Sequence, residues 1–369
     1  MESTKVAFIG VGDISGIYLE NLTKYFKQVE VVGLCDPIRE KAQRAQEKYG
    51  IPKIYETMYD AFADEEVEII VNLTRPYEHF AVTKAALEAG KHVYTEKPLA
   101  ATKEEGEQLI ALAKERGLSI GGAPDTFLGA SIQTCRKLID DGFIGRPIGF
   151  TAAMICRGHE SWHPSPAFYY QHGGGPLLDM GPYYLTALVN LLGRVTGVTA
   201  VAKASFPQRV ITSQPLAGTV VEVEVPTHLV GILELENGAV GTLFTTFDVV
   251  YKESSRFEVY GTEGTLIVPD PNHFGQTIYL LRPESREYKE MPLLFDYQDN
   301  FRGLGLADMA VALRSKRPIR ANQEQLFHVL DVMTAFERSS AKRAREEITS
   351  PYTRPEPMAK PRVLGIFDN

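Results

Sequence analysis

Short apolar runs and helix-like segments alternate along the first 120 residues of the chain. Runs such as "KVAFI" (5–9) and "VEVVGLC" (29–35) are largely apolar, as expected of strands buried on both faces of a sheet. Between them, apolar residues recur at helical spacing, and glycines such as Gly50 and Gly90 close the segments. Strands that alternate with helices predict βαβ units and a doubly wound parallel sheet. The other strands of this sheet are expected at 68–73, 92–95 and 118–122, with an edge strand at 53–56.

The pattern changes after about residue 124. A strongly apolar helix is expected over 183–193, and from about 196 to 282 the apolar and polar residues alternate as in strands. Asn237-Gly238, between two such runs, predicts a hairpin with a type I′ turn. Further helices are expected around 304–315 and 323–341. We therefore predict an α+β second half built on a largely antiparallel sheet.

Composition and charge narrow the class of protein. The 369-residue chain has 44% hydrophobic and 23% charged residues, which is typical of a globular protein. Its formal net charge is -8 and it has no long Lys/Arg block, which argues against a nucleic-acid partner. No apolar run approaches the roughly 20 residues that span a bilayer, so no membrane partner is expected. The chain shows no leader, and its three cysteines lie far apart without a CxxC pair, so we expect a reducing, cytoplasmic location.

The turn after the first predicted strand carries a partial glycine signature. In "FIGVGDISG", Gly10 and Gly12 occupy the first two positions of G-x-G-x-x-G, and Ser15 occupies the third. The first glycine permits a tight turn, the second lets a pyrophosphate approach the backbone, and the next helix offers unpaired N–H groups. An ordinary strand-to-helix turn is the alternative, but a strand before and a helix after the loop favour a dinucleotide site. Its expected residues are Gly10, Gly12, Asp13, Ile14 and Ser15.

Asp36 ends the next predicted strand, where the dinucleotide fingerprint has a ribose-binding acid. Its carboxylate would repel a 2′-phosphate, so NAD is favoured as the cofactor over NADP. Arg39 lies close enough to keep NADP as the less favoured alternative. Asp36 is also suited to cap the following helix, with Pro37 at the first helical position, and the two roles are compatible.

The segment "GKHVYTEKP" (90–98) places a lysine just beyond a buried strand. Ligands of doubly wound sheets bind outside the carboxyl ends of the strands, and Lys97 lies two residues past "HVYT". Pro98 disfavours the α region for Lys97 and keeps it extended. The alternative is a solvated surface lysine, but a place in the crevice favours a role beside the nicotinamide.

Four stretches together resemble one family. "GVGDIS", "LTRPYEHFAVTKAALEAGKHVYTEKPLA", "IDDGFIGRP" and "GGGPLLDMGPYY" are similar to successive signatures of the Gfo/Idh/MocA oxidoreductases. The resemblance implies an α/β fold, with a doubly wound Rossmann domain followed by an α+β domain whose open, mostly antiparallel sheet often packs against a partner subunit. We accordingly expect an NAD-binding domain at 1–123, a substrate-binding and oligomerisation domain at 124–348, and an extended proline-rich tail at 349–369. A homodimer or homotetramer through the second sheet is expected.

The resemblance also implies roles for individual residues. The family's Glu-Lys-Pro motif falls on Glu96, Lys97 and Pro98, which implies that the lysine lies near the nicotinamide and the substrate hydroxyl. Its Thr-Pro-Asn-x-x-His segment matches this chain only at Thr74 and His79, because the middle pair departs from the pattern. Glu96, Thr74 and His79 are therefore expected to take part in cofactor binding.

The family's Asp-x-Gly-x-His motif falls on Asp179, Gly181 and Tyr183, with tyrosine in place of histidine as in some members. Oxidation of a secondary alcohol sends a hydride to the nicotinamide and a proton to a base, and we expect Tyr183 to be that base. A free phenol has a pKa of about 10, and a nearby ammonium such as that of Lys97 favours the phenolate.

Asp179, four residues before Tyr183, is expected to orient Lys97 or to bind a neighbouring substrate hydroxyl. Pro182 suggests that a helix is only beginning there, so a shared helical face is not assured. The alternatives are a helix cap for Asp179, a half-buried aromatic for Tyr183, and Tyr184 as the base.

"HESWH" (159–163) matches the zinc-protease pattern H-E-x-x-H. That chemistry needs both histidines on one face of a stable helix, and Pro164 pushes His163 away from helical geometry. We therefore expect no metal site. The surrounding loop is aromatic, which suits the apolar face of a sugar ring, so Trp162 and His163 are expected to contact the substrate. Packing of this loop on the domain surface is the alternative.

The favoured function is an NAD-dependent dehydrogenase that acts on a secondary hydroxyl of a sugar, glycoside or cyclitol. One alternative is an enzyme of the same family that cleaves glycosides by transient oxidation and elimination on bound NAD. The other is a non-catalytic NAD-sensing regulator, against which the joint presence of Lys97, Asp179 and Tyr183 argues. A metalloprotease is a more distant alternative.

Overall fold

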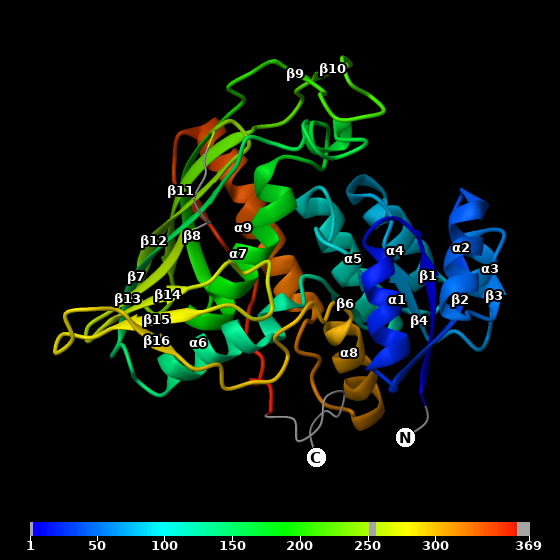
Figure 1. Cartoon of the computed structure of the whole chain (residues 1–369), viewed down its shortest axis with the longest axis horizontal. Helices are drawn as coiled ribbons and strands as arrows, with labels where there is room; N and C mark the ends of the chain where they lie inside the picture. The colour runs from blue at the N-terminus through cyan, green and yellow to red at the C-terminus, as the bar shows by residue number, and fades with distance from the viewer. Residues whose placement is uncertain (1–2, 251–255, 360–369) are drawn as a thin grey trace.

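The computed structural model describes residues 3–250 and 256–359, and two sheets organise these residues (Figure 1). The strands of the first sheet are β1 (Thr4–Ile9), β2 (Val29–Cys35), β3 (Lys53–Ile54), β4 (Ile69–Asn72), β5 (His92–Thr95) and β6 (Ile120–Gly122). The segments between them are α1 (Ser15–Lys24), α2 (Arg39–Tyr49), α3 (Met58–Ala63), η1 (Pro76–Glu78), α4 (His79–Glu88) and α5 (Lys103–Arg116). All neighbouring strands are parallel, in the order β3-β2-β1-β4-β5-β6. The predicted doubly wound parallel sheet is confirmed, including its edge strand β3.

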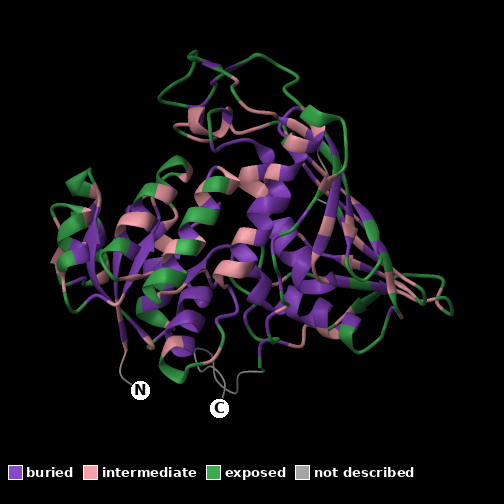
Figure 2. Ribbon diagram, turned by 180° about the vertical axis from the view of Figure 1, so that it is seen from behind, coloured by how far each residue is buried: buried purple, intermediate pink, exposed green. Residues whose placement is uncertain are grey.

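Burial explains why these runs form strands. Every residue of β4 is buried, and β1 and β2 each leave only one residue partly or fully exposed. Figure 2 shows these strands buried between helices whose outer sides are exposed. At the start of α5, the Thr102 hydroxyl accepts the Glu105 N–H, and the Glu105 carboxylate accepts the Thr102 N–H. This reciprocal capping box fixes where the helix begins.

The second half forms a mixed sheet that is mostly antiparallel. Its strands are β7 (Pro147–Ile155), β8 (Val195–Lys203), β11 (His228–Leu235), β12 (Val240–Thr246), β13 (Arg256–Gly261), β14 (Thr265–Val268), β15 (Ile278–Leu281), β16 (Lys289–Met291) and β17 (Glu346–Glu347). A separate pair consists of β9 (Gln208–Val210) and β10 (Val220–Glu222). The large sheet has the order β16-β15-β14-β13-β7-β12-β11-β8-β17, and only β7 and β12 are parallel neighbours. The predicted antiparallel character is confirmed.

The helical segments of this half are η2 (Thr126–Leu128), α6 (Ala130–Asp140), η3 (Ala167–Tyr170), α7 (Pro176–Leu192), α8 (Leu304–Ser315) and α9 (Gln323–Lys342). Figure 1 shows α7 and α9 between the large sheet and the parallel sheet. Alternate residues of β11 are buried, including Gly231, where an added Cβ would lie 2.4 Å from the Phe336 ring of α9. The sheet therefore buries one face against these helices. α8 packs beside β6 of the first sheet, and among the described residues no helix is long and apolar enough to span a bilayer.

The hairpin at Asn237-Gly238 exists, but its predicted turn type is wrong. The N–H of Gly238 donates to the Leu235 carbonyl, and the Leu235 N–H donates to the Ala239 carbonyl, so three residues form the loop. Only Gly238 has a positive φ, of 87°, whereas a type I′ turn needs two such residues. The extra residue makes this a longer turn whose left-handed position falls on the glycine.

Helix α7 begins earlier than predicted. Pro176 occupies its first turn, where a missing N–H costs nothing, and Gly175 precedes it. The expectation that a helix only begins at Pro182 is therefore wrong, because Pro182 lies inside a continuous helix of 17 residues. Residues 349–359 form no helix or strand, and the rest of the predicted tail lies outside the described residues.

Candidate active site

Lys97 and Asp179 meet at the boundary between the two halves of the chain. Lys97 follows β5 by two residues, at the carboxyl end of the parallel sheet. Its Nζ lies 2.7 Å from Asp179 Oδ1 and donates a second hydrogen bond of 2.7 Å to the Asp179 backbone carbonyl. The structure thus brings together two predicted site residues that are 82 positions apart.

Tyr183 lies one helical turn after Asp179 on α7. Lys97 Nζ is 5.4 Å from the centroid of its ring, and Tyr183 is only 8% exposed. Tyr184, the alternative base, is 1% exposed, and its ring lies 6.2 Å from that of Phe257. Of the two tyrosines, Tyr183 is therefore the one beside the ammonium.

Burial and charge act in opposite directions on the Lys97–Asp179 pair. Burial alone would raise the pKa of Asp179, but the Lys97 charge and the His159 hydrogen bond lower that pKa to about 2. Burial alone would lower the pKa of Lys97, but Asp179 and Tyr183 raise it above its ordinary value. The pair is therefore charged at neutral pH. Lys97 can therefore supply a positive charge and hydrogen bonds at this position.

His159 is a site residue that the sequence reasoning missed. Its Nε2 lies 3.2 Å from Asp179 Oδ2, so Asp179 bridges the lysine and the imidazole. The His159 ring sits 3.9 Å from that of Tyr169 and 4.7 Å from that of Phe247, measured between centroids. The signal is the first histidine of "HESWH", which a reading of this pattern as a metal motif does not single out.

Trp162 and His163, the predicted substrate contacts, are not among the residues bonded to Asp179. Trp162 is 62% exposed, with its ring centroid 5.2 Å from that of His159 and 5.4 Å from that of His163. The His163 N–H donates to the His159 carbonyl, so the motif forms one turn and not a stable helix. Among the described residues, no group of His, Cys, Asp and Glu is arranged to hold a metal ion.

A buried arginine anchors this loop. Arg209, in β9 of the small sheet, is 5% exposed, and its Nη1 lies 3.0 Å from Glu160 Oε1. The Tyr170 hydroxyl donates to Glu160 Oε2 at 2.6 Å, and Arg209 also pairs with Asp248. The position of His159 is therefore set by contacts of the adjacent Glu160.

The glycine loop fits a dinucleotide. Gly10 has a φ of 93°, and a Cβ there would lie 2.7 Å from the Leu73 carbonyl oxygen, so only glycine is accommodated. A Cβ at Gly12 would meet no atom within 4 Å, so the backbone there borders open space. Ser15 begins α1, and its hydroxyl donates to the Gly12 carbonyl at 2.7 Å. The N-terminal end of α1 thus borders the space where a pyrophosphate would lie.

Asp36 joins the glycine loop to the end of β2. Its Oδ2 accepts the Val11 N–H at 2.7 Å, and its Oδ1 accepts the Ile38 N–H at 2.8 Å. Helix α2 begins at Arg39 and its cap position is Ile38, so the predicted helix cap with Pro37 in the first turn is wrong. Each carboxylate oxygen keeps lone pairs for a further donor, such as a ribose hydroxyl.

Three other predicted cofactor residues bind protein groups. Glu96 accepts the Tyr18 hydroxyl at 2.8 Å and the Lys97 N–H at 3.1 Å. His79 is buried, with Nδ1 2.7 Å from the Pro98 carbonyl and Nε2 3.1 Å from the Thr74 carbonyl. Burial lowers the pKa of His79. These contacts tie together the loops that follow β4 and β5, and so hold Lys97 in place.

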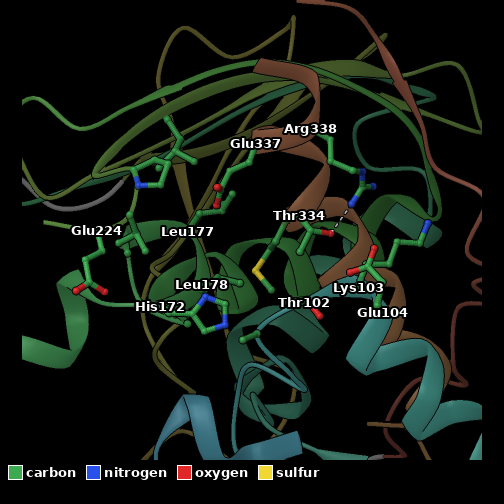
Figure 3. A pocket seen from close by; sticks show the side chains of 18 residues that line it. Thr102, Lys103, Glu104, His172, Leu177, Leu178, Glu224, Thr334, Glu337 and Arg338 are labelled. Carbon is green, nitrogen blue, oxygen red and sulfur yellow. Dashed lines mark hydrogen bonds between the residues drawn. The ribbon is translucent and has the colours of Figure 1, made fainter. Parts of the chain in front are cut away.

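A cavity of about 330 Å³ lies near the start of α7 (Figure 3). Its lining combines apolar side chains such as Leu177 and Leu229 with His172 and Glu337, and burial raises the pKa of Glu337. Lys97, Asp179 and Tyr183 do not line it. The cavity shares only the beginning of α7 with the site described above.

Two family models match the chain. One, described as an oxidoreductase family with an NAD-binding Rossmann fold, matches residues 4–121. The other, described as a GFO/IDH/MocA C-terminal domain, matches residues 132–267. Together they match more than half of the sequence.

The chain is also similar to individual proteins, with sequence identities below 30% for the three described next. A D-xylose dehydrogenase of Paenarthrobacter nicotinovorans is 28% identical over 272 residues, which are 71% of this chain and 68% of that protein. A scyllo-inositol 2-dehydrogenase (NAD(+)) of Bacillus subtilis is 24% identical over 298 residues, which are 80% of this chain and 81% of that protein. The solved structure of a levoglucosan dehydrogenase in complex with NADH and L-sorbose has a TM-score of 0.81 at 20% identity and covers 94% of this chain and 99% of that one. At this identity the last comparison shows a shared fold.

Proposed function

This chain belongs to the Gfo/Idh/MocA oxidoreductases, and we propose that it is an NAD-dependent dehydrogenase of a sugar, glycoside or cyclitol. In this proposal residues 1–123 bind NAD and residues 124–348 bind the substrate. The observation that carries the proposal is the Lys97–Asp179 ion pair against the ring of Tyr183, at the carboxyl end of the parallel sheet. The dehydrogenase names of the relatives support the substrate class.

Bound NAD would supply the hydride acceptor. As the substrate C–H and O–H bonds break, the hydride would go to the bound NAD, and the hydroxyl proton passes to the phenolate oxygen of Tyr183. The carbinol carbon loses two electrons, and the proton leaves through the tyrosine. Lys97 holds the substrate oxygen and favours the phenolate by its charge, while Asp179 keeps the ammonium in position.

The aromatic loop supplies a surface for the substrate ring in this proposal. Trp162 and His163 lie beyond His159, which reaches Asp179. Aromatic faces suit the apolar side of a sugar ring, and imidazole nitrogens suit its hydroxyls. The three free cysteines support a reducing cytoplasm as the place of action.

A panel of sugars, glycosides and cyclitols tests both the reaction and the cofactor. With NAD, at least one compound should produce NADH absorbance, and kcat/KM should be lower with NADP because Asp36 repels a 2′-phosphate. The Asp36→Ala variant should narrow this preference by weakening NAD more than NADP. If Asp36→Ala lowered kcat/KM equally with NAD and with NADP, Asp36 would only hold the glycine loop.

The same panel separates the alternatives. Cleavage of a glycoside without net NADH would indicate transient oxidation followed by elimination. Binding of NAD without turnover of any compound would indicate a sensor and would contradict the proposed reaction.

The outer face of the large sheet is the proposed contact with a second copy of the chain. Val201 of β8 pairs with Val230 of β11, and these are 66% and 42% exposed. Ile232 and Val240 on neighbouring strands are each 48% exposed. An apolar sheet face of this kind is expected to be covered in solution.

We expect the double variant with Val230→Lys and Ile232→Lys to have a lower sedimentation coefficient than the native dimer or tetramer, closer to that of a monomer. Both side chains point outward, so lysines there leave the inner face of the sheet intact. Tyr59→Lys, at a 62% exposed position on α3, should leave the assembly unchanged. A sheet variant that sediments like the native protein would exclude this face as the interface.

A further inference from the structure

A second cation lies beside Tyr183. The Cζ atom of Arg302 is 6.0 Å from the centroid of the Tyr183 ring, and Lys97 Nζ is 5.4 Å from it. Arg302 precedes α8, whereas Lys97 follows β5, so the two charges reach the phenol from different segments. The family motifs in the sequence contain no counterpart of Arg302.

The charge of Arg302 is not neutralised by an ion pair. Its Nη1 donates to Asn300 Oδ1 at 2.8 Å, and its Nη2 donates to Asn272 Oδ1 at 2.6 Å and to the Asn272 carbonyl at 3.2 Å. These acceptors are neutral, and no carboxylate in the described part of the chain forms a salt bridge with the guanidinium. Lys97, in contrast, is paired with Asp179. Arg302 therefore lies beside Tyr183 without a salt-bridge partner among the described residues, although the nearby Asp125 carboxylate also attracts its charge.

Residues from both parts of the chain hold the segment that carries Arg302. The Asn21 amide of α1 donates to the carbonyls of Asn300 and Arg302, each at 2.8 Å. Asp125 Oδ2 accepts the N–H groups of Gly303 and Gly305 at 2.8 and 3.0 Å. The backbone on both sides of Arg302 is thus fixed, and Asn300 and Asn272 hold its guanidinium.

We propose that Arg302 is a positioning residue of the dehydrogenase site, which holds the Tyr183 phenol and stabilises its phenolate while Lys97 serves Asp179 and the substrate oxygen. The inference rests on the proposed function for its meaning in catalysis, but its effect on Tyr183 does not depend on any substrate. Burial lowers the pKa of Arg302, yet interaction with Tyr183 raises it above the ordinary value, which agrees with attraction between the two groups.

The groups around Tyr183 come from four segments: the loop after β5, the loop before α8, helix α7 and η3. Lys97 and Arg302 are positive, Asp179 on the same helix is negative, and Tyr169 of η3 is a neutral phenol whose pKa is raised by burial and by Asp179. Removal of Arg302 therefore leaves Lys97 as the only cation in this set, and its charge is shared with Asp179. The phenolate should then form only at higher pH.

Carbon-13 NMR of the full-length protein labelled at the tyrosine Cζ measures this directly. The resonance missing from Tyr183→Phe identifies Tyr183, and its shift is followed against pH. In Arg302→Met the midpoint should lie at least about one pH unit higher than in the native protein. Arg302→Lys should restore part of the difference, because it returns the charge without the planar fork. Arg314→Met, on α8 and paired with Glu68, should leave the midpoint unchanged.

A native midpoint in Arg302→Met would overturn the proposal, provided that circular dichroism shows the variant to be folded. An Arg302→Lys midpoint equal to that of Arg302→Met would also contradict it, because the charge itself is claimed to act. With an active substrate, the acid limb of the pH profile of kcat should lie at higher pH in Arg302→Met, while KM for NAD stays constant. The NMR result stands even if no compound in the panel is oxidised, so the two proposals fail separately.

Discussion

The Lys97→Ala variant is expected to lower kcat roughly a thousandfold while NAD affinity changes little. The ammonium lies 2.7 Å from Asp179 and 5.4 Å from the Tyr183 ring centroid, so its loss removes the charge that favours the phenolate and the donor for the substrate oxygen. Steady-state NADH production measures kcat, and isothermal titration measures NAD binding.

Two controls keep this result interpretable. Removal of Lys97 leaves Asp179 buried without its cation, which destabilises the folded state, so Lys97→Ala/Asp179→Asn is measured beside it. Lys84→Ala removes a surface lysine, 3.9 Å from Glu88, and should keep native turnover. Turnover within about twofold of native in both Lys97 variants would remove the lysine from the mechanism.

Tyr183→Phe is expected to reduce kcat by a similar factor, about a thousandfold, because general base catalysis contributes about 10² to 10⁴. The substitution keeps the ring beside Lys97 and removes only the oxygen that takes the proton. KM should change less than kcat, since the substrate oxygen still binds Lys97. Initial rates over a range of substrate concentrations separate the two constants.

Tyr184→Phe is the matched control, since Tyr184 follows Tyr183 on α7 and is 1% exposed. We expect its kcat to stay close to native. A large loss of kcat in Tyr184→Phe, together with near-native kcat in Tyr183→Phe, would show that Tyr184 and not Tyr183 is the base.

Much of the fold could be predicted because its determinants are local. Uniformly apolar runs form the strands of the parallel sheet, and the Thr102–Glu105 box marks the start of α5. The resemblance to the Gfo/Idh/MocA oxidoreductases is confirmed by the two family models. The position of Lys97 at a strand end followed from the general rule for ligand sites in doubly wound sheets.

The errors arose where tertiary structure outweighed local pattern. Pro182 was expected near a helix start, but α7 is held by packing along its length and starts instead at Pro176. Asn237-Gly238 favours a type I′ turn, but the pairing of Leu235 with Ala239 adds a third loop residue. In both places a residue preference predicted the element and misplaced its boundary or geometry.

The full set of side chains at the site of Asp179 and Tyr183 could not be predicted for a different reason. His159, which contacts Asp179, and Arg302, which lies beside Tyr183, come from segments 143 positions apart, and both reach α7 only in the folded chain. Arg302 belongs to no motif, and its orientation is set by neutral partners such as Asn272. Only a three-dimensional structure shows that this arginine and Lys97 flank one phenol.

The central claim is most directly tested by a crystal structure of Tyr183→Phe with NAD and the sugar that native protein oxidises fastest. We expect the carbinol carbon within about 3.5 Å of nicotinamide C4, with the hydroxyl hydrogen-bonded to Lys97 and directed at the edge of the substituted ring at position 183. A nicotinamide bound away from Lys97, or a hydroxyl held by other groups with the ring at position 183 facing away from it, would contradict the account.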